Sequence, residues 1–142
     1  MSQPIYKLLL LCMLIASGTL TAQEAKQYFQ NGLREQSNGN YEKAEEWYAK
    51  SLRADSNFAR AYVNRGTMKY FMGDTAGAVS DYDAAVRSDP KLVAAYINRG
   101  LVKYNCGDWS NAVEDHNKAI EMNDKLTDVY FLRGRMRAGR GE

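Results

Sequence analysis

The chain has 142 residues, of which 45% are hydrophobic and 25% are charged, and its formal net charge is +2. With two prolines, this composition fits one globular domain of mostly helical character. It excludes a disordered tail, and the near balance of charge argues against nucleic acid as the partner.

Residues 1–22 have the layout of a secretory signal peptide. A single cation, Lys7, precedes the apolar run LLLLCMLIA, and the small and polar stretch SGTLTAQ follows it. The run is shorter than the roughly 20 apolar residues that a transmembrane helix needs. We therefore expect an exported protein, periplasmic or secreted, that has no integral membrane span and loses this leader.

Two cleavage points fit the leader, and a lipoprotein is a third alternative. Cleavage after Gly18 gives a small-x-small pattern with Ala16, whereas cleavage after Ala22 places Leu20 at the usual small position; we favour Ala22. A lipoprotein would acylate Cys12, but the residue before it is a leucine. Removal of residues 1–22 takes away one cation and no acid, which leaves a net charge of +1. It also leaves Cys106 as the only cysteine, so no intramolecular disulfide can form.

The remainder of the chain repeats itself every 34 residues. The segment QYFQNG at 27–32 recurs as AYVNRG at 61–66, AYINRG at 95–100 and VYFLRG at 129–134. A fixed period in this range is typical of repeat arrays. With repeats drawn at 25–58, 59–92 and 93–126 and a last helix at 127–138, further places agree: a glycine at Gly39, Gly73 and Gly107, and an alanine at Ala44, Ala78 and Ala112.

Each repeat is predicted to be a helix, a turn and a second helix. The pairs Gly73-Asp74 and Gly107-Asp108 combine a permissive glycine at the end of one helix with an N-cap for the next. Asp89-Pro90 ends a second helix, since proline cannot continue the hydrogen-bond ladder. Because neither helix can bury its apolar side alone, the repeats must stack, and the last helix is expected to act as a cap.

This pattern resembles the tetratricopeptide repeat family, whose landmarks match at Tyr62, Gly66, Ala78, Tyr82 and Pro90. The resemblance covers residues 25 to about 138 and assigns 23–142 to one repeat domain. It implies an all-α, right-handed superhelix of three repeats and a C-terminal capping helix, in which the first helices line a concave groove. It also implies a protein that binds other proteins and has no catalytic activity.

Two further places vary together along the repeats. The seventh place holds Arg65 and Arg99 where the twenty-third holds Asp81 and Asp115, whereas the first repeat has neither residue. We predict an ion pair between the two helices of a repeat, with coincidence as the alternative. Arg133 has no equivalent aspartate in this chain and is expected to meet either solvent or another molecule.

The sequence offers no convincing catalytic or metal site, so we expect neither an enzyme nor a cofactor. His116 takes the place that Tyr48 and Tyr82 hold in the other repeats, which indicates a packed residue rather than a base. Cys106, beside a turn, is expected to be a small interior or inter-helix residue rather than a reactive thiol. One histidine and one cysteine after residue 22 fall short of a metal-ligand set.

A stripe along the first helices is the candidate partner site, because places five, nine and twelve share one helix face. Asparagines at the sixth place can both donate and accept hydrogen bonds to a peptide backbone. The alternative is that half of the stripe packs first helix on first helix. The candidate residues are Phe29, Leu33, Val63, Asn64, Thr67, Tyr70, Ile97, Asn98, Leu101, Tyr104 and Arg135.

One subclass of the family holds acidic chaperone tails in a carboxylate clamp, and the resemblance does not extend to it. Asn64 matches the central asparagine, but the flanking lysine, asparagine and arginine places hold Phe29, Leu33, Ala94 and Asn98. We therefore expect a module of the bacterial cell envelope that binds a different peptide or protein. The alternatives are a structural subunit that self-associates, in particular through the C-terminal helix, and an accessory regulator of an exported enzyme.

Overall fold

The computed structural model describes residues 3–139, and this part of the chain folds into seven α-helices and no strand. The all-α fold class predicted from the repeat is confirmed. The helices are α1 (Gln3–Ser37), α2 (Tyr41–Ala54), α3 (Ala59–Phe71), α4 (Thr75–Ser88), α5 (Val93–Asn105), α6 (Trp109–Met122) and α7 (Thr127–Gly139).

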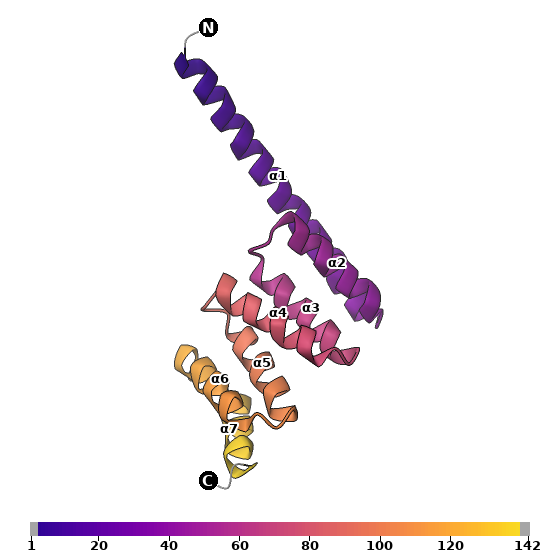
Figure 1. Ribbon diagram of the computed structural model, residues 1–142, viewed down its shortest axis with the longest axis vertical. Coiled ribbons are helices and arrows are strands. Elements are labelled where there is room, and N and C mark those ends of the chain that lie inside the picture. Colours follow the sequence, from indigo (N-terminus) through magenta and orange to yellow (C-terminus); the bar gives the residue numbers. More distant parts are fainter. Residues whose placement is uncertain (1–2, 140–142) are drawn as a thin grey trace.

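The helices form hairpins that stack along the long axis of the molecule (Figure 1). α1 pairs with α2, α3 with α4 and α5 with α6, while α2 packs on α3, α4 on α5 and α7 on α6. α3 also contacts α5, so the first helices of neighbouring hairpins lie side by side. This places the odd-numbered helices along one face of the stack.

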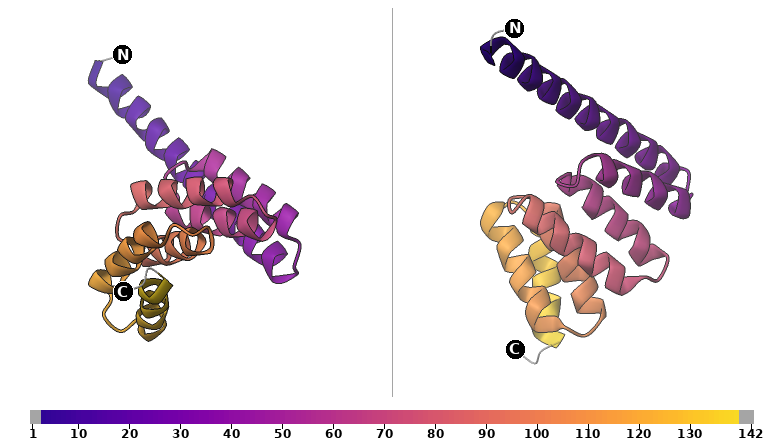
Figure 2. Two further views of the ribbon diagram at one scale, coloured as in Figure 1. Left: turned by 60° about the horizontal axis from the view of Figure 1, so that its bottom comes forward. Right: turned by 45° about the horizontal axis from the view of Figure 1, so that its top comes forward.

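The first half of α1 projects away from the stacked hairpins (Figure 2). Residues 18–24 are exposed, and Ala25 is buried where α1 meets the end of α2. The expected end of the leader after Ala22 therefore lies inside a continuous helix, and the site of cleavage stays a prediction. Within residues 3–139, the search for a helix of sufficient length and apolarity to cross a membrane found none.

The turn inside each hairpin follows the glycine and N-cap pattern. Gly73 has a φ of 88°, a left-handed conformation that glycine adopts without a steric cost. The next residue, Asp74, accepts a hydrogen bond from the backbone N–H of Gly77 through its Oδ1 at 2.9 Å and so caps α4. Asp108 caps α6 in the same way with the N–H of Asn111. In the first hairpin, Asn40 instead donates its side-chain amide to Glu35.

The turns between hairpins share a device that the sequence analysis did not single out. The side chains of Asp55, Asp89 and Asn123 each accept a hydrogen bond from the backbone N–H two residues later, at 2.9 to 3.1 Å. Such short polar side chains imitate a turn of the backbone. They occur 34 residues apart, so each second helix ends at the same place in its repeat.

Each hairpin is closed by a ring of the second helix that lies on a glycine of the first helix. A Cβ built on Gly66 would lie 3.0 Å from Cε1 of Tyr82 and 3.1 Å from the carbonyl oxygen of Ala78. A side chain at Gly66 would therefore have to displace the ring or the facing backbone. The same contact joins Gly32 to Tyr48 and Gly100 to His116. We call these three pairs the glycine–ring contacts.

The predicted ion pairs between the two helices of a repeat are confirmed. Arg65 donates its Nε and Nη2 to the two carboxylate oxygens of Asp81 at 2.8 and 2.6 Å. Arg99 binds Asp115 with the same two nitrogens at 2.9 and 2.6 Å. The hydrogen bond to the facing aspartate raises the pKa of each guanidinium, most strongly for Arg99. The aspartate side chains are only 5% and 6% exposed.

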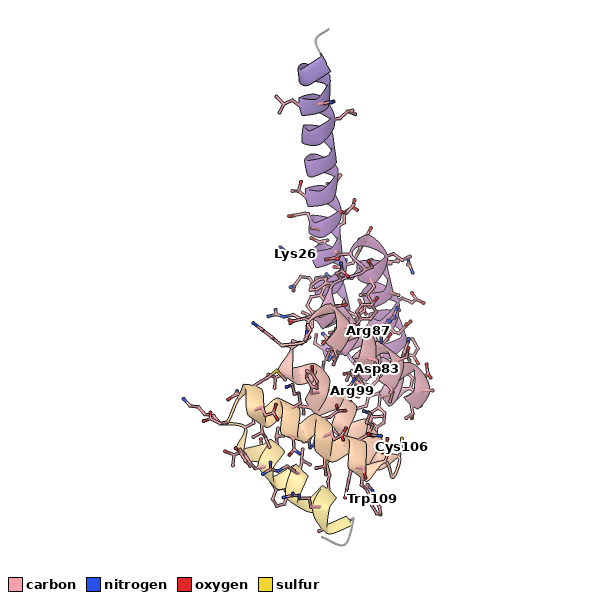
Figure 3. All side chains as sticks on the ribbon, turned by 60° about the vertical axis from the view of Figure 1, so that its left-hand side comes forward. Lys26, Asp83, Arg87, Arg99, Cys106 and Trp109 are labelled. Atoms are coloured by element: carbon pink, nitrogen blue, oxygen red, sulfur yellow. The ribbon has the colours of Figure 1, made fainter. Side chains whose placement is uncertain are left out.

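The ion pairs extend further than the sequence comparison predicted. Lys69 reaches Asp81 at 3.1 Å, and Lys103 reaches Asp115 at 3.0 Å, so each buried aspartate has two cations. Arg99 also donates its Nη1 to Asp83 of the preceding repeat at 2.6 Å, and Figure 3 shows the two side chains side by side. The arginine therefore joins two repeats as well as two helices.

Arg133 is not surrounded by solvent, which was one of the two alternatives predicted from the sequence. Its side chain is half-buried, and its Nη1 donates to the Oδ1 of Asn117 at 3.1 Å. Asn117 occupies the place that Asp83 holds one repeat earlier. The partner that the structure gives this arginine is an amide on the preceding helix.

Replacement of Ala78 by leucine should destabilise the protein by roughly 1 to 3 kcal/mol, as overpacking of a core does. Ala78 is fully buried and its backbone lies against Gly66. The control is Ala76→Leu on the same helix, where the side chain is exposed and little change is expected. Urea denaturation measures both; equal stability of the two variants would contradict the close approach of α3 and α4.

Replacement of Asp81 by asparagine should lower the free energy of unfolding by roughly 2 to 3 kcal/mol, because two cations lose their buried partner. The value is below that of a fully enclosed pair, since Arg65 and Lys69 are 20% and 21% exposed. The control is Glu121→Gln, which breaks the exposed pair with Lys118 and should change the stability little, because water screens exposed pairs. If denaturation gives similar losses for both, the Asp81 pair contributes no more than a surface pair.

Candidate functional site

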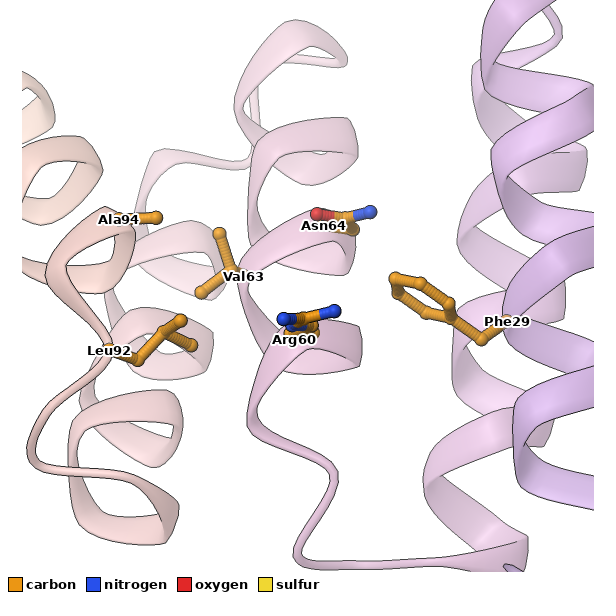
Figure 4. Close-up of a pocket in the computed structure, with 6 residues that line it drawn as sticks. All are labelled: Phe29, Arg60, Val63, Asn64, Leu92 and Ala94. Atoms are coloured by element: carbon orange, nitrogen blue, oxygen red, sulfur yellow. The ribbon is translucent and has the colours of Figure 1, made fainter. Parts of the chain in front are cut away.

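Three hollows follow one another along the odd-numbered helices, and the first lies between α1, α3 and α5. It has a volume of about 220 Å³ and is lined by Phe29, Arg60, Val63, Asn64, Leu92 and Ala94. Figure 4 shows Phe29 reaching in from α1 and Ala94 facing it from α5 across α3. The wall is mostly apolar, with one cation and one amide.

Side-chain packing positions the groups in the first hollow. The ring of Phe29 lies between those of Tyr48 and Phe58, with ring centroids 5.6 and 4.9 Å away. Asn64 donates its amide nitrogen to the hydroxyl of Tyr48 at 3.3 Å, and that hydroxyl donates to Gln36. Burial raises the pKa of Tyr48, which keeps the phenol protonated as a donor. The amide oxygen of Asn64 lies on the side of α5 (Figure 4).

The second and third hollows lie further along the same face. The second, of about 160 Å³ between α3 and α5, is lined by Thr67, Tyr70, Phe71, Tyr82, Asn98, Leu101 and Val102. The third, of about 420 Å³ between α5 and α7, is lined by Ile97, Lys125, Leu126, Thr127, Asp128, Val129 and Leu132. We call the face that carries the three hollows the first-helix groove.

Most of the candidate residues from the sequence line these hollows. Phe29, Val63 and Asn64 line the first, while Ile97 lines the third. The candidate residues in the second hollow are Thr67, Tyr70, Asn98 and Leu101.

Three candidate residues do not line any of the three hollows. Leu33 packs against the core that contains Phe29 and Tyr48, and Tyr104 packs against Val113 and Met136. Arg135 is exposed on α7. The alternative that part of the stripe packs helix on helix therefore applies to Leu33 and Tyr104.

Several residues of the groove are not among the candidates from the sequence. Arg60 and Ala94 are each four residues before an asparagine of the stripe, so the helical period could have found them. Leu92 and Leu126 lie in the turns between hairpins, where no helical period applies. Their place in the groove follows only from how one hairpin stacks on the next.

His116 is a packed residue, as predicted, and its surroundings keep it neutral. It is fully buried against Gly100, and its Nε2 lies 3.3 Å from the carbonyl oxygen of Ile97, which requires the proton on Nε2. No hydrogen-bond partner for Nδ1 lies among the described residues. Burial lowers the pKa of His116 below its usual value of 6.5.

The expectation that Cys106 is an interior residue was wrong. The residue caps the end of α5 and is exposed in the turn before α6, near Trp109 (Figure 3). The sequence comparison misled because the tight turn directs this place outward, whatever the size of its side chain. Within residues 3–139, no group of three or more histidine, cysteine, aspartate or glutamate side chains is placed to hold a metal ion.

Stability should fall as the pH drops below about 6.5, because the unfolded chain then binds a proton that buried His116 resists. Above that pH, both states are neutral at this residue and the contribution disappears. His116→Tyr, which restores the residue of the other repeats, should remove this part of the pH dependence. Denaturation curves at pH 7 and pH 5 measure the free energy of unfolding at each pH. If it changes equally between the two pH values in the parent and the variant, His116 is not responsible.

The comparisons with known proteins agree with this geometry. The Tetratricopeptide repeat family model matches residues 35–58 and 59–92, and the second match spans one whole hairpin, α3 and α4. A search of the curated proteins found none that matches the chain.

Solved structures share the fold over most of the chain. The first TPR of Spaghetti (RPAP3) bound to the HSP90 peptide SRMEEVD is 21% identical, with a TM-score of 0.82 over 85% of this chain and 96% of that one. The TPR domain of Arabidopsis OM64 is 19% identical, with a TM-score of 0.80 over 83% and 98%. The TPR2B domain of yeast Sti1, in a complex with pHsp70, is 18% identical, with a TM-score of 0.73 over 82% and 95%. Residues 35–92 therefore match tetratricopeptide repeats, and the described chain has the superhelix of helix–turn–helix units that the repeat pattern in the sequence predicted.

Proposed function

We propose that this chain is a non-catalytic interaction module of the bacterial cell envelope, which binds a segment of another protein along the first-helix groove. The row of three hollows on one face carries this proposal. Each hollow is open to solvent and mostly apolar, and each lies between two or three helices of the described chain. Preformed concave sites of this kind are where proteins bind peptides and small molecules.

The chemistry of the groove favours an extended segment with apolar side chains. Hollows of about 160 to 420 Å³ accommodate single aliphatic or aromatic side chains rather than a whole domain. Asn64 and Asn98 line the first and second hollows, and an amide can both donate to and accept from a peptide backbone. The apolar contacts would supply affinity, and the amides would set the direction of the bound segment.

An acidic C-terminal peptide fits this groove less well. The Spaghetti structure contains a peptide that ends in EEVD. Here the clamp places hold Phe29, Leu33 and Ala94, of which Phe29 and Ala94 line the first hollow. Arg60 is the one cation of that hollow and is exposed. A desolvated carboxylate would lack the cluster of cations that offsets its burial.

The envelope setting rests on residues 1–22, whose lysine, apolar run and small-residue end are those of an export signal. Self-association through α7 is the less favoured alternative. The described part of α7 carries three cations and one acid, namely Arg133, Arg135, Arg137 and Asp128. Two copies that met through this helix would bring like charges together, which opposes a symmetric contact.

Filling the first hollow should abolish partner capture. Ala94→Trp places a large ring in the hollow from an exposed position, so binding should fall at least about tenfold if the partner uses this site. The control is Arg87→Trp, exposed on α4 (Figure 3), which should bind as the parent does. The measurement is a pull-down from envelope and cytosolic extracts, followed by titration of the purified partner.

Three results of that experiment would contradict the proposal. A partner that binds Ala94→Trp and the parent equally would exclude the first hollow. A partner lost equally with Arg87→Trp would indicate a general effect of tryptophan on the surface. A specific partner found only in the cytosolic extract would contradict the envelope setting while leaving the groove intact.

A further inference from the structure

α7 is a first helix without its second helix in the described chain. The glycine–ring contacts fill the face of α1, α3 and α5 at Gly32, Gly66 and Gly100. At the equivalent Gly134 on α7, a built Cβ would meet nothing within 4 Å. Two large apolar side chains of this helix are exposed as well, Tyr130 at 40% and Phe131 at 68%. The face that receives a ring in the other repeats is therefore open on α7.

Arg133 is held next to this open face in the pose of its equivalents. Its guanidinium carbon lies 5.1 Å from the ring centroid of Tyr130, as that of Arg99 lies 5.5 Å from the ring centroid of Tyr96. Its Nη1 binds Asn117 of the preceding repeat, as that of Arg99 binds Asp83. The contacts that orient the guanidinium are thus present on α7.

The other edge of the Arg133 guanidinium differs from its equivalents. In Arg65 and Arg99, the Nε and Nη2 atoms bind both oxygens of an aspartate on the second helix. No carboxylate pairs with Arg133 in residues 3–139. A planar, preoriented guanidinium edge matches a carboxylate with two parallel hydrogen bonds.

We propose that α7 is a second docking site, which takes an amphipathic helix of a partner protein with an alanine, an acidic residue three places later and an aromatic residue directly after it. That register is the one that α4 presents to α3 with Ala78, Asp81 and Tyr82. The acid binds Arg133, and the ring lies on Gly134. The proposal is independent of the first-helix groove, because Arg133 and Gly134 line none of its three hollows.

Charge and burial decide for a partner protein rather than a second copy. The helices of this chain that carry the required register, α4 and α6, bury Ala78, Asp81 and Tyr82 or their equivalents in their own hairpins. Those helices cannot reach another molecule without opening the fold. Arg135 holds the place on α7 that Thr67 holds on α3, where the Thr67 hydroxyl contacts that of Tyr82 on the second helix. Because Arg135 is exposed there, it adds a second cation to the site and favours an acidic helix.

The test uses the protein and a peptide of residues 75–88, the α4 sequence, with a covalent staple between positions 76 and 80. Both positions are exposed in the folded chain, so the staple leaves the Ala78, Asp81 and Tyr82 face free, and circular dichroism verifies that the peptide is helical. Binding is followed through the amide signals of α7 and the Nε–H signal of Arg133 in NMR spectra. The control peptide carries Asp81→Asn, and the control protein carries Gly134→Leu, which has room for the side chain and favours the helix.

We expect saturable shifts confined to α7 and Arg133, and binding weaker by roughly tenfold or more with either the Asp81→Asn peptide or the Gly134→Leu protein. No binding of the helical peptide up to about 1 mM would overturn the proposal. Equal binding of the two peptides would also overturn it, because the contact would then be merely apolar. Shifts of α7 that depend on protein concentration without peptide would assign this face to a second copy instead.

Discussion

The contact between a glycine of the first helix and a ring of the second is the constraint on which the rest of this structure depends. Helices of 13 or 14 residues are marginal on their own in water, so α2 to α6 persist because they pair. Because Gly66 has no Cβ, the ring of Tyr82 can lie directly on the backbone of α3. The same kind of contact recurs at Gly32 and Gly100, so each of the three hairpins is closed at the equivalent place and the hairpins can stack.

The buried aspartates add a second kind of contact between the two helices of a hairpin. Asp81 and Asp115 each bind an arginine and a lysine one turn apart on the facing first helix. The cost of removing these charges from water offsets much of their attraction, so their main effect is to fix the orientation of one helix against the other. Arg99 also binds Asp83, which couples that orientation to the preceding repeat. In the first repeat, Tyr28 stacks on Trp47 and Lys50 lies over the same indole, so an aromatic contact takes the place of the ion pair.

The groove is the part of the first helices that these contacts leave uncovered. One side of α3 is committed to α4 through Gly66, another packs on α2 through Ala61 and Met68, and α3 also contacts α5. Asn64 remains half-buried between them, held by Tyr48 but open toward the first hollow. Val63 contributes both to the core and to the wall of that hollow. Binding and stability therefore share side chains, and the exposed Ala94 is one of the few places where the groove can change without a change in the core.

The sequence by itself determined the repeat, its helix–turn–helix unit, the recurring glycine of the first helix and the pairing of Arg65 with Asp81. All of these depend on local chemistry or on spacings within 34 residues, and each recurs, so comparison of one repeat with the next reveals it. The period also identified eight residues of the first-helix groove. It did not predict that Leu92 and Leu126 line the groove, that Cys106 is exposed or that Arg133 binds Asn117. The exposure of Cys106 depends on the tight turn inside its hairpin. The other facts depend on the angle at which one hairpin packs on the next, which results from side-chain contacts between repeats and cannot be read from a recurring spacing.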